Sequence, residues 1–436
     1  MPVSKKEPPR KGRRAAIVAG LRSPFVKSNG VFRKLSALDM GGRVVSELVA
    51  RYNLPVSEID RVVYGQVVPA IPTPNIAREI VLGTGLPRSI DGYSVSRACA
   101  TSTQALVEGT MAIEAGDADL VICGGADSLS RPPITFSDRF VEMLMKANSA
   151  RDPMSKLKAF SKLKPRDLVP VPPAIAEFST GKTMGESAEQ MAKDNEISRE
   201  DQDALAVRSH QRSAKAWEAG IYDDEVLAFP VPPGYKEVVD RDNLVRGDST
   251  IEKLERLRPV FDRALGTVTA ATSSPLTDGA SAVILMSEER AASLGYTPLA
   301  FVKSWGFAAL DPEWQLLMGP AFASPLALDR AGLTLADIDL VDMHEAFAAQ
   351  VLSNMKAFGS KEFAKERLGR EEAIGEIDVD KFNIHGGSLS LGHPFAATGT
   401  RQALTMANEL NRRGGGTALI TQCAAGGLGA AVILEK

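Results

Sequence analysis

Short hydrophobic runs alternate with amphipathic stretches along most of this chain. In the first half, strand-like runs at residues 15–20, 61–68 and 118–126 are separated by helix-like stretches, one of them at residues 38–50. Apolar positions recur every three to four residues in an amphipathic helix, whereas a buried strand reads as a short continuous apolar run. The alternation predicts an α/β fold in which helices cover a sheet.

The second half repeats this rhythm. Strands are expected at residues 298–307, 338–343, 381–387 and 417–436. Helices are expected near residues 324–331, from residue 345, and at 396–411. The run ADLVICGGADS in the first half parallels TALITQCAAGG in the second, each a strand that follows a helix and ends in small residues. We therefore expect an internal duplication of two similar halves.

Residues from about 131 to 263 break the alternation, and a loop followed by a strand then resumes it at 266–286. We expect this segment to be a loop domain inserted into the N-terminal half, which spans 15–295. The C-terminal half spans 296–436. Residues 1–14 form a basic tail that we expect to fray.

Composition narrows the possible functions. The net charge of −3 over 436 residues argues against a general nucleic-acid binder, which needs a basic surplus. Three cysteines cannot form a disulfide framework. No apolar run approaches the ~18 residues of a membrane span. We expect a soluble, cytoplasmic protein.

Two cysteines and two histidines follow predicted strands or their equivalents in the two halves. Cys99 follows GYSVSR, His344 follows IDLVDM, and Cys423 follows TALITQ. His393 lies in the glycine-containing stretch LGHPFAATG. Ligands of open α/β sheets bind beyond the carboxyl ends of the strands, so these four side chains are expected to share one site.

A cysteine at a helix N-terminus beside a histidine has its pKa lowered from ~8.5 into the range ~3.5 to 7.5. We therefore expect Cys99 to be largely thiolate at neutral pH, with nearby backbone N–H groups forming an oxyanion hole. A lone cysteine among small residues is otherwise a packing residue, which is our interpretation of Cys123. We expect His210 to be a hydrogen-bonded structural residue and His385 to brace a glycine turn.

Other motifs do not fit. HEAFA lacks the second histidine of HExxH, and no GxxxxGK[ST] occurs, so neither a zinc-protease site nor a P-loop is expected. GGLG precedes a strand rather than a helix, which excludes the dinucleotide-binding motif. No bound metal or cofactor is expected.

The blocks SRACATS, HEAFA, GHPFAATG and CAAGGLGAA resemble, in this order, the active-site blocks of the thiolase family. The resemblance covers nearly the whole chain and implies the thiolase fold: two βαβαβαββ-type halves, an inserted loop domain and a tight homodimer. It implies that Cys99 is the acyl-accepting nucleophile, that His393 activates it and stabilises the enolate oxygen, and that Cys423 is the general acid and base. Many members have asparagine where this chain has His344, and we expect His344 to hold a water in the oxyanion hole. Ala425 replaces a glycine but keeps the backbone N–H.

The implied reaction is cleavage of a 3-ketoacyl-CoA by the co-substrate CoA in fatty-acid β-oxidation. The motifs are most similar to the thiolase subunits of β-oxidation complexes, which implies a partner with enoyl-CoA hydratase and 3-hydroxyacyl-CoA dehydrogenase activities. Two alternatives are a short-chain acetoacetyl-CoA thiolase working in the condensing direction and a thiolase-like subunit that binds acyl-CoA or a partner without catalysis.

Other residues match the family less specifically. Those expected to line the CoA channel, unless they are ordinary packing residues, are Met184, Phe261, Ser274, Ala346 and Phe347. Basic residues interleaved with apolar ones between 139 and 166 are most often a solvated helix face. In this family they are candidates for contact with CoA phosphates, a partner subunit or a membrane surface.

Overall fold

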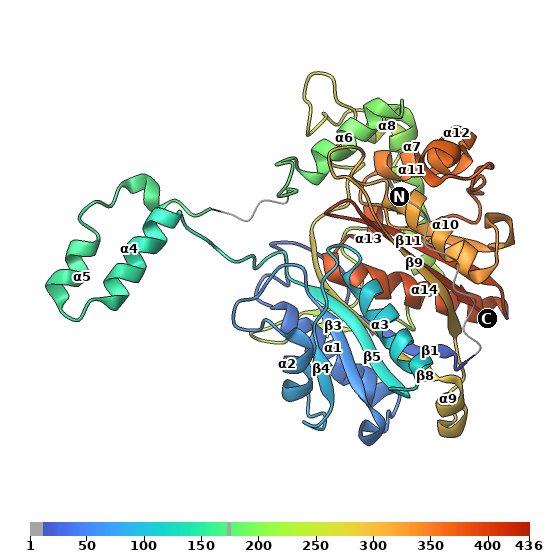
Figure 1. The fold of residues 1–436 in the computed structure, drawn as a ribbon, viewed down its shortest axis with the longest axis horizontal. Helices are drawn as coiled ribbons and strands as arrows, with labels where there is room; N and C mark the ends of the chain where they lie inside the picture. Colours follow the sequence, from blue (N-terminus) through green and yellow to red (C-terminus); the bar gives the residue numbers. More distant parts are fainter. Residues whose placement is uncertain (1–11, 172–175) are drawn as a thin grey trace.

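The computed structural model describes residues 12–171 and 176–436 (Figure 1). Most of the predicted basic tail lies outside these ranges. Arg13 pairs with Asp119, and Arg14 lies 3.0 Å from the Glu435 carboxylate. The prediction that the tail frays is therefore wrong for its last two residues.

One mixed sheet runs through the molecule in the order β10-β11-β12-β9-β1-β8-β5-β3-β4. The strands of the N-terminal half are β1 (Ala15–Arg22), β3 (Arg61–Gly65), β4 (Asp91–Tyr93), β5 (Leu120–Asp127) and β8 (Thr277–Ser287), with the short β2 (Val26–Lys27) beside β8. Those of the C-terminal half are β9 (Ala300–Ala309), β10 (Leu340–Met343), β11 (Thr417–Ala424) and β12 (Leu428–Glu435). The two sets join where β1 pairs with β9.

Strand pairing confirms the predicted duplication. In the N-terminal half β3 pairs parallel with β5, β5 antiparallel with β8, and β8 antiparallel with β1. In the C-terminal half β10 likewise pairs parallel with β11, β11 antiparallel with β12, and β12 antiparallel with β9. The strand expected at 381–387 is reduced to one bridge between Val341 and Phe382, because Asn383 and Gly386 have positive φ and turn the chain.

Helices cover the sheet, and two of them meet in the middle of the molecule (Figure 1). These are α3 (Thr101–Ala115) and α14 (Thr398–Arg413), which pack against each other. Helix α3 also packs on strands of the N-terminal half, and α14 on strands of both halves. Gly399 permits the contact, since a Cβ there would lie 2.2 Å from the Thr103 hydroxyl. The other helices of the two halves are α1 (Ala37–Arg51), α2 (Ile76–Gly83), α9 (Glu288–Leu294), α10 (Gly319–Ala331), α11 (Ala348–Gly359), α12 (Lys361–Phe363) and α13 (Ser388–Leu391).

The predicted insertion leaves the sheet after β5 and returns at β8. Its helices are α4 (Asp138–Ser149), α5 (Pro153–Ala159), α6 (Met184–Asp194), α7 (Arg199–Glu218) and α8 (Ile251–Leu254). Helices α6 and α7 pack on α11, whereas α4 and α5 form a hairpin that stands away from the body (Figure 1). Within the described ranges, no helix is long and apolar enough to cross a membrane.

Candidate active site

Cys99 is presented on a tight turn between β4 and α3. Ala98 has φ 44°, a left-handed conformation that is strained for a residue with a Cβ. The Thr101 hydroxyl holds the turn by accepting from the Arg97 N–H at 2.9 Å and donating to the Ala98 carbonyl at 2.7 Å. Helix α3 begins two residues after Cys99, so the thiol lies at the positive end of the helix dipole.

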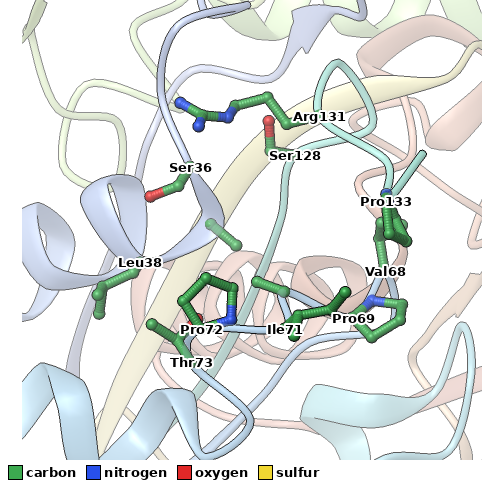
Figure 2. A pocket seen from close by; sticks show the side chains of 12 residues that line it. Ser36, Leu38, Val68, Pro69, Ile71, Pro72, Thr73, Ser128, Arg131 and Pro133 are labelled. Carbon is green, nitrogen blue, oxygen red and sulfur yellow. The ribbon is translucent and has the colours of Figure 1, made fainter. Parts of the chain in front are cut away.

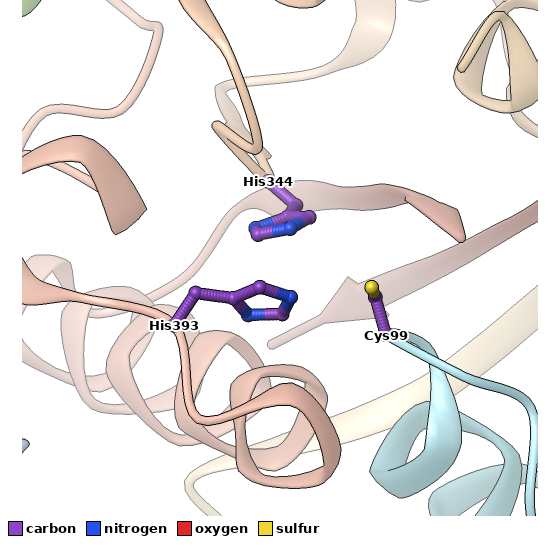
Figure 3. Close-up of side chains that lie close together, drawn as sticks. All are labelled: Cys99, His344 and His393. Atoms are coloured by element: carbon purple, nitrogen blue, oxygen red, sulfur yellow. The ribbon is translucent and has the colours of Figure 1, made fainter. Parts of the chain in front are cut away.

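Two buried imidazoles face Cys99 (Figure 3). His344 directly follows β10, and its Nδ1 lies 2.8 Å from Ser388 Oγ. His393 lies between α13 and α14, with Nδ1 2.7 Å from Thr398 Oγ1. The ring centroids are 4.0 Å apart, and the Nε2 atoms of both rings have no hydrogen-bond partner among the described residues. The two hydroxyls therefore fix both rings by one nitrogen and leave the other free for a ligand.

The structure brings the four predicted side chains together. The Cys99 thiol and one nitrogen of each imidazole lie within 4.8 Å of one another. Cys423 lies near the carboxyl end of β11, close enough for the charge of Cys99 to raise its pKa. The backbone N–H groups of Ala425 and of Cys99 itself donate toward the Cys99 sulfur.

The expected resting thiolate is wrong. Burial raises the pKa of Cys99 to about 12, with a smaller contribution from the negative charge of Asp127, and the two N–H groups only partly oppose this rise. Burial, together with the positive charge of Arg401, lowers the pKa of His393 to about 3. At neutral pH the pair is thus a thiol beside a neutral imidazole that can accept its proton.

The pKa values of His344 and Cys423 are shifted so that both side chains are uncharged at neutral pH. Burial lowers the pKa of His344 well below its usual value, and a proton on His393 and the positive charge of Arg401 each lower it further. Burial and the charge of Cys99 raise the pKa of Cys423 well above its usual value. Cys423 is therefore a protonated thiol, in the state that a proton donor to carbon requires.

The five residues expected in the CoA channel lie together beside the imidazoles. The rings of Phe261 and Phe347 meet edge to face with centroids 6.0 Å apart. The Ser274 N–H donates to the Ala346 carbonyl at 2.9 Å, and Met184 precedes Gly185, where a Cβ would touch the Phe261 ring. Leu276, two residues after Ser274, forms a backbone bridge with His393. The segment that carries Ser274 therefore runs beside the reactive side chains.

The other cysteine and histidines have the structural roles predicted for them. Cys123 is fully buried, and a Cβ on Gly109 would lie 2.5 Å from its sulfur. His210 accepts from the Arg246 N–H at 3.2 Å. The His385 carbonyl accepts from the Tyr222 and Ser213 hydroxyls, which anchors the glycine turn that follows.

Sequence reasoning missed several polar residues that support the site. Ser388 and Thr398 hold the two imidazoles. Thr398 lies five residues after His393, inside the block GHPFAATG, whereas Ser388 is 44 positions from His344 and is brought to it only by the fold. Asp127, fully buried at the end of β5, accepts from the N–H groups of Val67 and Val68 and from that of Ala396, three residues after His393. Burial raises the pKa of Asp127 to about 7.

A surface cavity of about 350 Å³ lies between the segments that follow β3 and β5 (Figure 2). Prolines and aliphatic side chains dominate its wall, and its one charged side chain, Arg131, is bonded to the Lys34 carbonyl at 2.8 Å. It contains none of the paired nucleophile and base groups found around Cys99.

Comparison with known proteins gives a consistent result. Residues 15–289 match the model of the thiolase N-terminal domain, and residues 296–436 match that of the thiolase C-terminal domain. The chain is 58% identical over 426 residues to a 3-ketoacyl-CoA thiolase of Pseudoalteromonas translucida and 56% identical to one of Yersinia pestis, covering 98% of each chain. The human mitochondrial 3-ketoacyl-CoA thiolase in complex with CoA superposes with a TM-score of 0.80 at 29% identity, over 97% of this chain and 98% of that one. An acetyl-CoA acetyltransferase of Bacillus anthracis gives 0.82 at 30%, over 97% and 99%.

Proposed function

The chain belongs to the thiolase family, and we propose that it is a 3-ketoacyl-CoA thiolase that works through a Cys99 acyl-enzyme. It cleaves a 3-ketoacyl-CoA with CoA into acetyl-CoA and an acyl-CoA two carbons shorter, as a step of fatty-acid β-oxidation. The observation that carries the proposal is the grouping of the Cys99 thiol with one nitrogen each of His393 and His344, all within 4.8 Å of one another. The pair of Cys99 and His393 suits attack on a carbonyl with transfer of the thiol proton to the imidazole.

In the first half-reaction Cys99 attacks the C3 carbonyl as His393 takes its proton. The N–H groups of Cys99 and Ala425 stabilise the oxyanion that forms at C3. The C2–C3 bond then breaks, leaving the acyl group on Cys99 and an acetyl-CoA enolate. Cys423 protonates C2 of the enolate, and acetyl-CoA leaves.

In the second half-reaction the Cys423 thiolate takes the thiol proton of CoA, which attacks the Cys99 thioester. The shortened acyl-CoA forms, and the Cys99 sulfur leaves and recovers its proton from His393. All three groups return to their starting protonation states, so the cycle balances.

The hydroxyl partners suit different tautomers of the two imidazoles. His393 acts as a base at Nε2 when Nδ1–H donates to Thr398. His344 donates from Nε2 when its Nδ1 accepts from Ser388, so it can hold the enolate oxygen or a water bound to that oxygen. The lowered pKa of His344 keeps the ring neutral, so one nitrogen can accept from Ser388 while the other donates.

The test is mass analysis of the intact protein mixed with a 3-ketoacyl-CoA. Wild type should gain the acyl group on Cys99, and Cys99→Ser should gain none. Cys423→Ala should acylate but turn over poorly, and unimpaired turnover would remove Cys423 from the acid and base role. Cys123→Ala is the matched control, because Cys123 packs in the core away from the imidazoles.

The nearest rival is an acetoacetyl-CoA thiolase working in the condensing direction. The solved structures do not separate the two, since an acetyl-CoA acetyltransferase superposes as well as a 3-ketoacyl-CoA thiolase. Sequence favours degradation, because the curated relatives at 56–58% identity are 3-ketoacyl-CoA thiolases. Rates with 3-ketoacyl-CoAs of increasing chain length decide, and activity confined to acetoacetyl-CoA would refute the degradative assignment.

A non-catalytic subunit is the other alternative. It predicts no acyl-enzyme in any of these assays, and the grouping of Cys99, His393 and Cys423 in one site argues against it.

We also propose that each chain consists of two halves, 15–295 and 296–436. Two chains form a homodimer, and the protein works in the cytoplasm. Support comes from β4, which ends the sheet and pairs with β3 alone among the described strands. Light scattering of the purified protein tests the dimer. Co-purification of enoyl-CoA hydratase and 3-hydroxyacyl-CoA dehydrogenase activities tests the larger complex.

The α4–α5 hairpin is our candidate for a peripheral membrane contact. Residues 139–166 contain eight basic and two acidic side chains, and Met145, Met154 and Leu157 are at least 62% exposed. Exposed apolar groups beside basic ones favour anionic lipid surfaces. Sedimentation with anionic vesicles should be lost in Lys156→Glu/Lys158→Glu, and equal binding to neutral vesicles would contradict the assignment.

A further inference from the structure

Cys99, His344 and His393 also constitute a set of metal-binding donors. We propose that these three side chains bind one Zn²⁺ ion, which reversibly blocks the nucleophile. The inference rests on the donor geometry of the described residues and does not require the proposed thiolase activity. The thiol and one nitrogen of each imidazole lie within 4.8 Å of one another (Figure 3).

The two histidines are already arranged as metal ligands. Their Nε2 atoms are buried and have no hydrogen-bond partner in the part of the chain that the structure describes, and burying a polar atom without a partner costs free energy that a ligand can recover. Their Nδ1 atoms are held by the hydroxyls of Ser388 and Thr398 at 2.8 and 2.7 Å. Metal-binding histidines commonly have their second nitrogen fixed in this way, since it sets the direction of the first.

The donor types select the ion. One sulfur and two imidazole nitrogens suit Zn²⁺, whereas Mg²⁺ and Ca²⁺ require oxygen ligands. Zn–S bonds of ~2.3 Å and Zn–N bonds of ~2.0 Å in a tetrahedron place the donors roughly 3.5 Å apart. The donors must therefore close by about 1 Å, and Cys99 is the one of the three that is partly exposed.

Binding of Zn²⁺ displaces the thiol proton of Cys99 and is opposed by a nearby positive charge. The Cys99 thiol releases its proton to solvent as the Zn–S bond forms, and water fills the fourth position. The positive charge of Arg401 opposes a cation here, but Asp342 pairs with that guanidinium at 3.1 Å and offsets part of it. While Zn²⁺ is bound, Cys99 cannot attack a carbonyl.

Direct metal binding tests the proposal in the absence of CoA, whose thiol would itself bind zinc. Co²⁺ serves as the spectroscopic probe, because cobalt bound to a thiolate gives a near-ultraviolet charge-transfer band. Wild type should show this band at one Co²⁺ per chain, and Zn²⁺ should abolish it. Zn²⁺ affinity is measured by competition with a chromogenic chelator.

Variants assign the ligands. Cys99→Ser should lose the cobalt band, and His344→Asn and His393→Asn should weaken Zn²⁺ binding at least about tenfold. Cys123→Ala should bind as wild type does. Circular dichroism establishes that each variant is folded.

A measurement on wild type covers the case of a variant that does not fold. Stoichiometric Zn²⁺ should protect Cys99 from iodoacetamide, and EDTA should restore labelling. An unchanged cobalt band in Cys99→Ser, unchanged affinity in folded His344→Asn, or no protection of Cys99 would each overturn the proposal. A protein that forms the acyl-enzyme but fails these tests refutes the zinc site alone.

Discussion

The hydrogen bond between Thr398 and His393 should control how fast Cys99 is acylated. Thr398 Oγ1 lies 2.7 Å from His393 Nδ1, and both residues are buried. Thr398→Val keeps the shape of the side chain and removes the acceptor for Nδ1–H. An unsatisfied buried donor costs ~1–3 kcal/mol, and the imidazole avoids this cost only by moving its proton to Nε2, where it blocks the base.

The shift of the proton to Nε2 disfavours the reactive tautomer by up to this amount. At 1.36 kcal/mol for each factor of ten, acylation should slow by about 5- to 150-fold. The assay is quenched-flow mixing with acyl-CoA, followed by intact mass to count acylated Cys99. Thr400→Val is the matched control, because Thr400 lies on the same helix and its buried hydroxyl bonds to Ser281 instead. Acylation of folded Thr398→Val at the wild-type rate would refute the role of this hydrogen bond.

Three further predictions follow from the same contacts. Alkylation of Cys99 by iodoacetamide should keep rising through pH 9, because a thiol whose pKa is about 12 gains thiolate throughout this range; a plateau below pH 8 would restore the resting thiolate. Asp127→Asn should flatten the pH dependence of the unfolding midpoint between pH 4 and 7. The pKa of Asp127 is raised to about 7 in the folded state, so the folded state holds this proton more tightly, and the stabilisation is complete below pH 4 and lost as the pH rises through 7. Gly185→Ala should raise the KM for acyl-CoA severalfold, because the new Cβ would lie 1.9 Å from the Phe261 ring, whereas Gly83→Ala, with open space at its Cβ, should not.

The fold was accessible from the sequence because its signals are local. Apolar runs located most strands, and the helix after Cys99 ends at Gly116 in the left-handed conformation that glycine favours. The pairing of strands in two equivalent sets then follows from the repeated order of elements. The strand predicted at 381–387 was wrong because the chain turns at Asn383, where φ is positive. An apolar pattern carries no information about such a turn.

The chemistry of the site was only partly accessible. Strand-end positions correctly predicted that the four reactive side chains lie together. The pKa of Cys99, however, was predicted to be lowered, whereas it is raised. The helix dipole is visible in sequence, whereas the burial that outweighs it comes from residues such as Ala424 and Phe307, which are distant along the chain. The partner of His344 is likewise 44 positions away.

The site lies where the two halves meet, so its geometry depends on contacts between them. The buried carboxylate of Asp127 in the N-terminal half accepts from the Ala396 N–H in the C-terminal half at 2.7 Å. Gly125, on the same strand, lets the chain after His393 approach closely, since a Cβ there would lie 2.2 Å from the Ala396 carbonyl. Hydrogen bonds weaken steeply with distance and angle, so these contacts fix the position of His393 relative to Cys99 more narrowly than apolar packing would. The duplicated fold thereby aligns a nucleophile from one half with a base from the other.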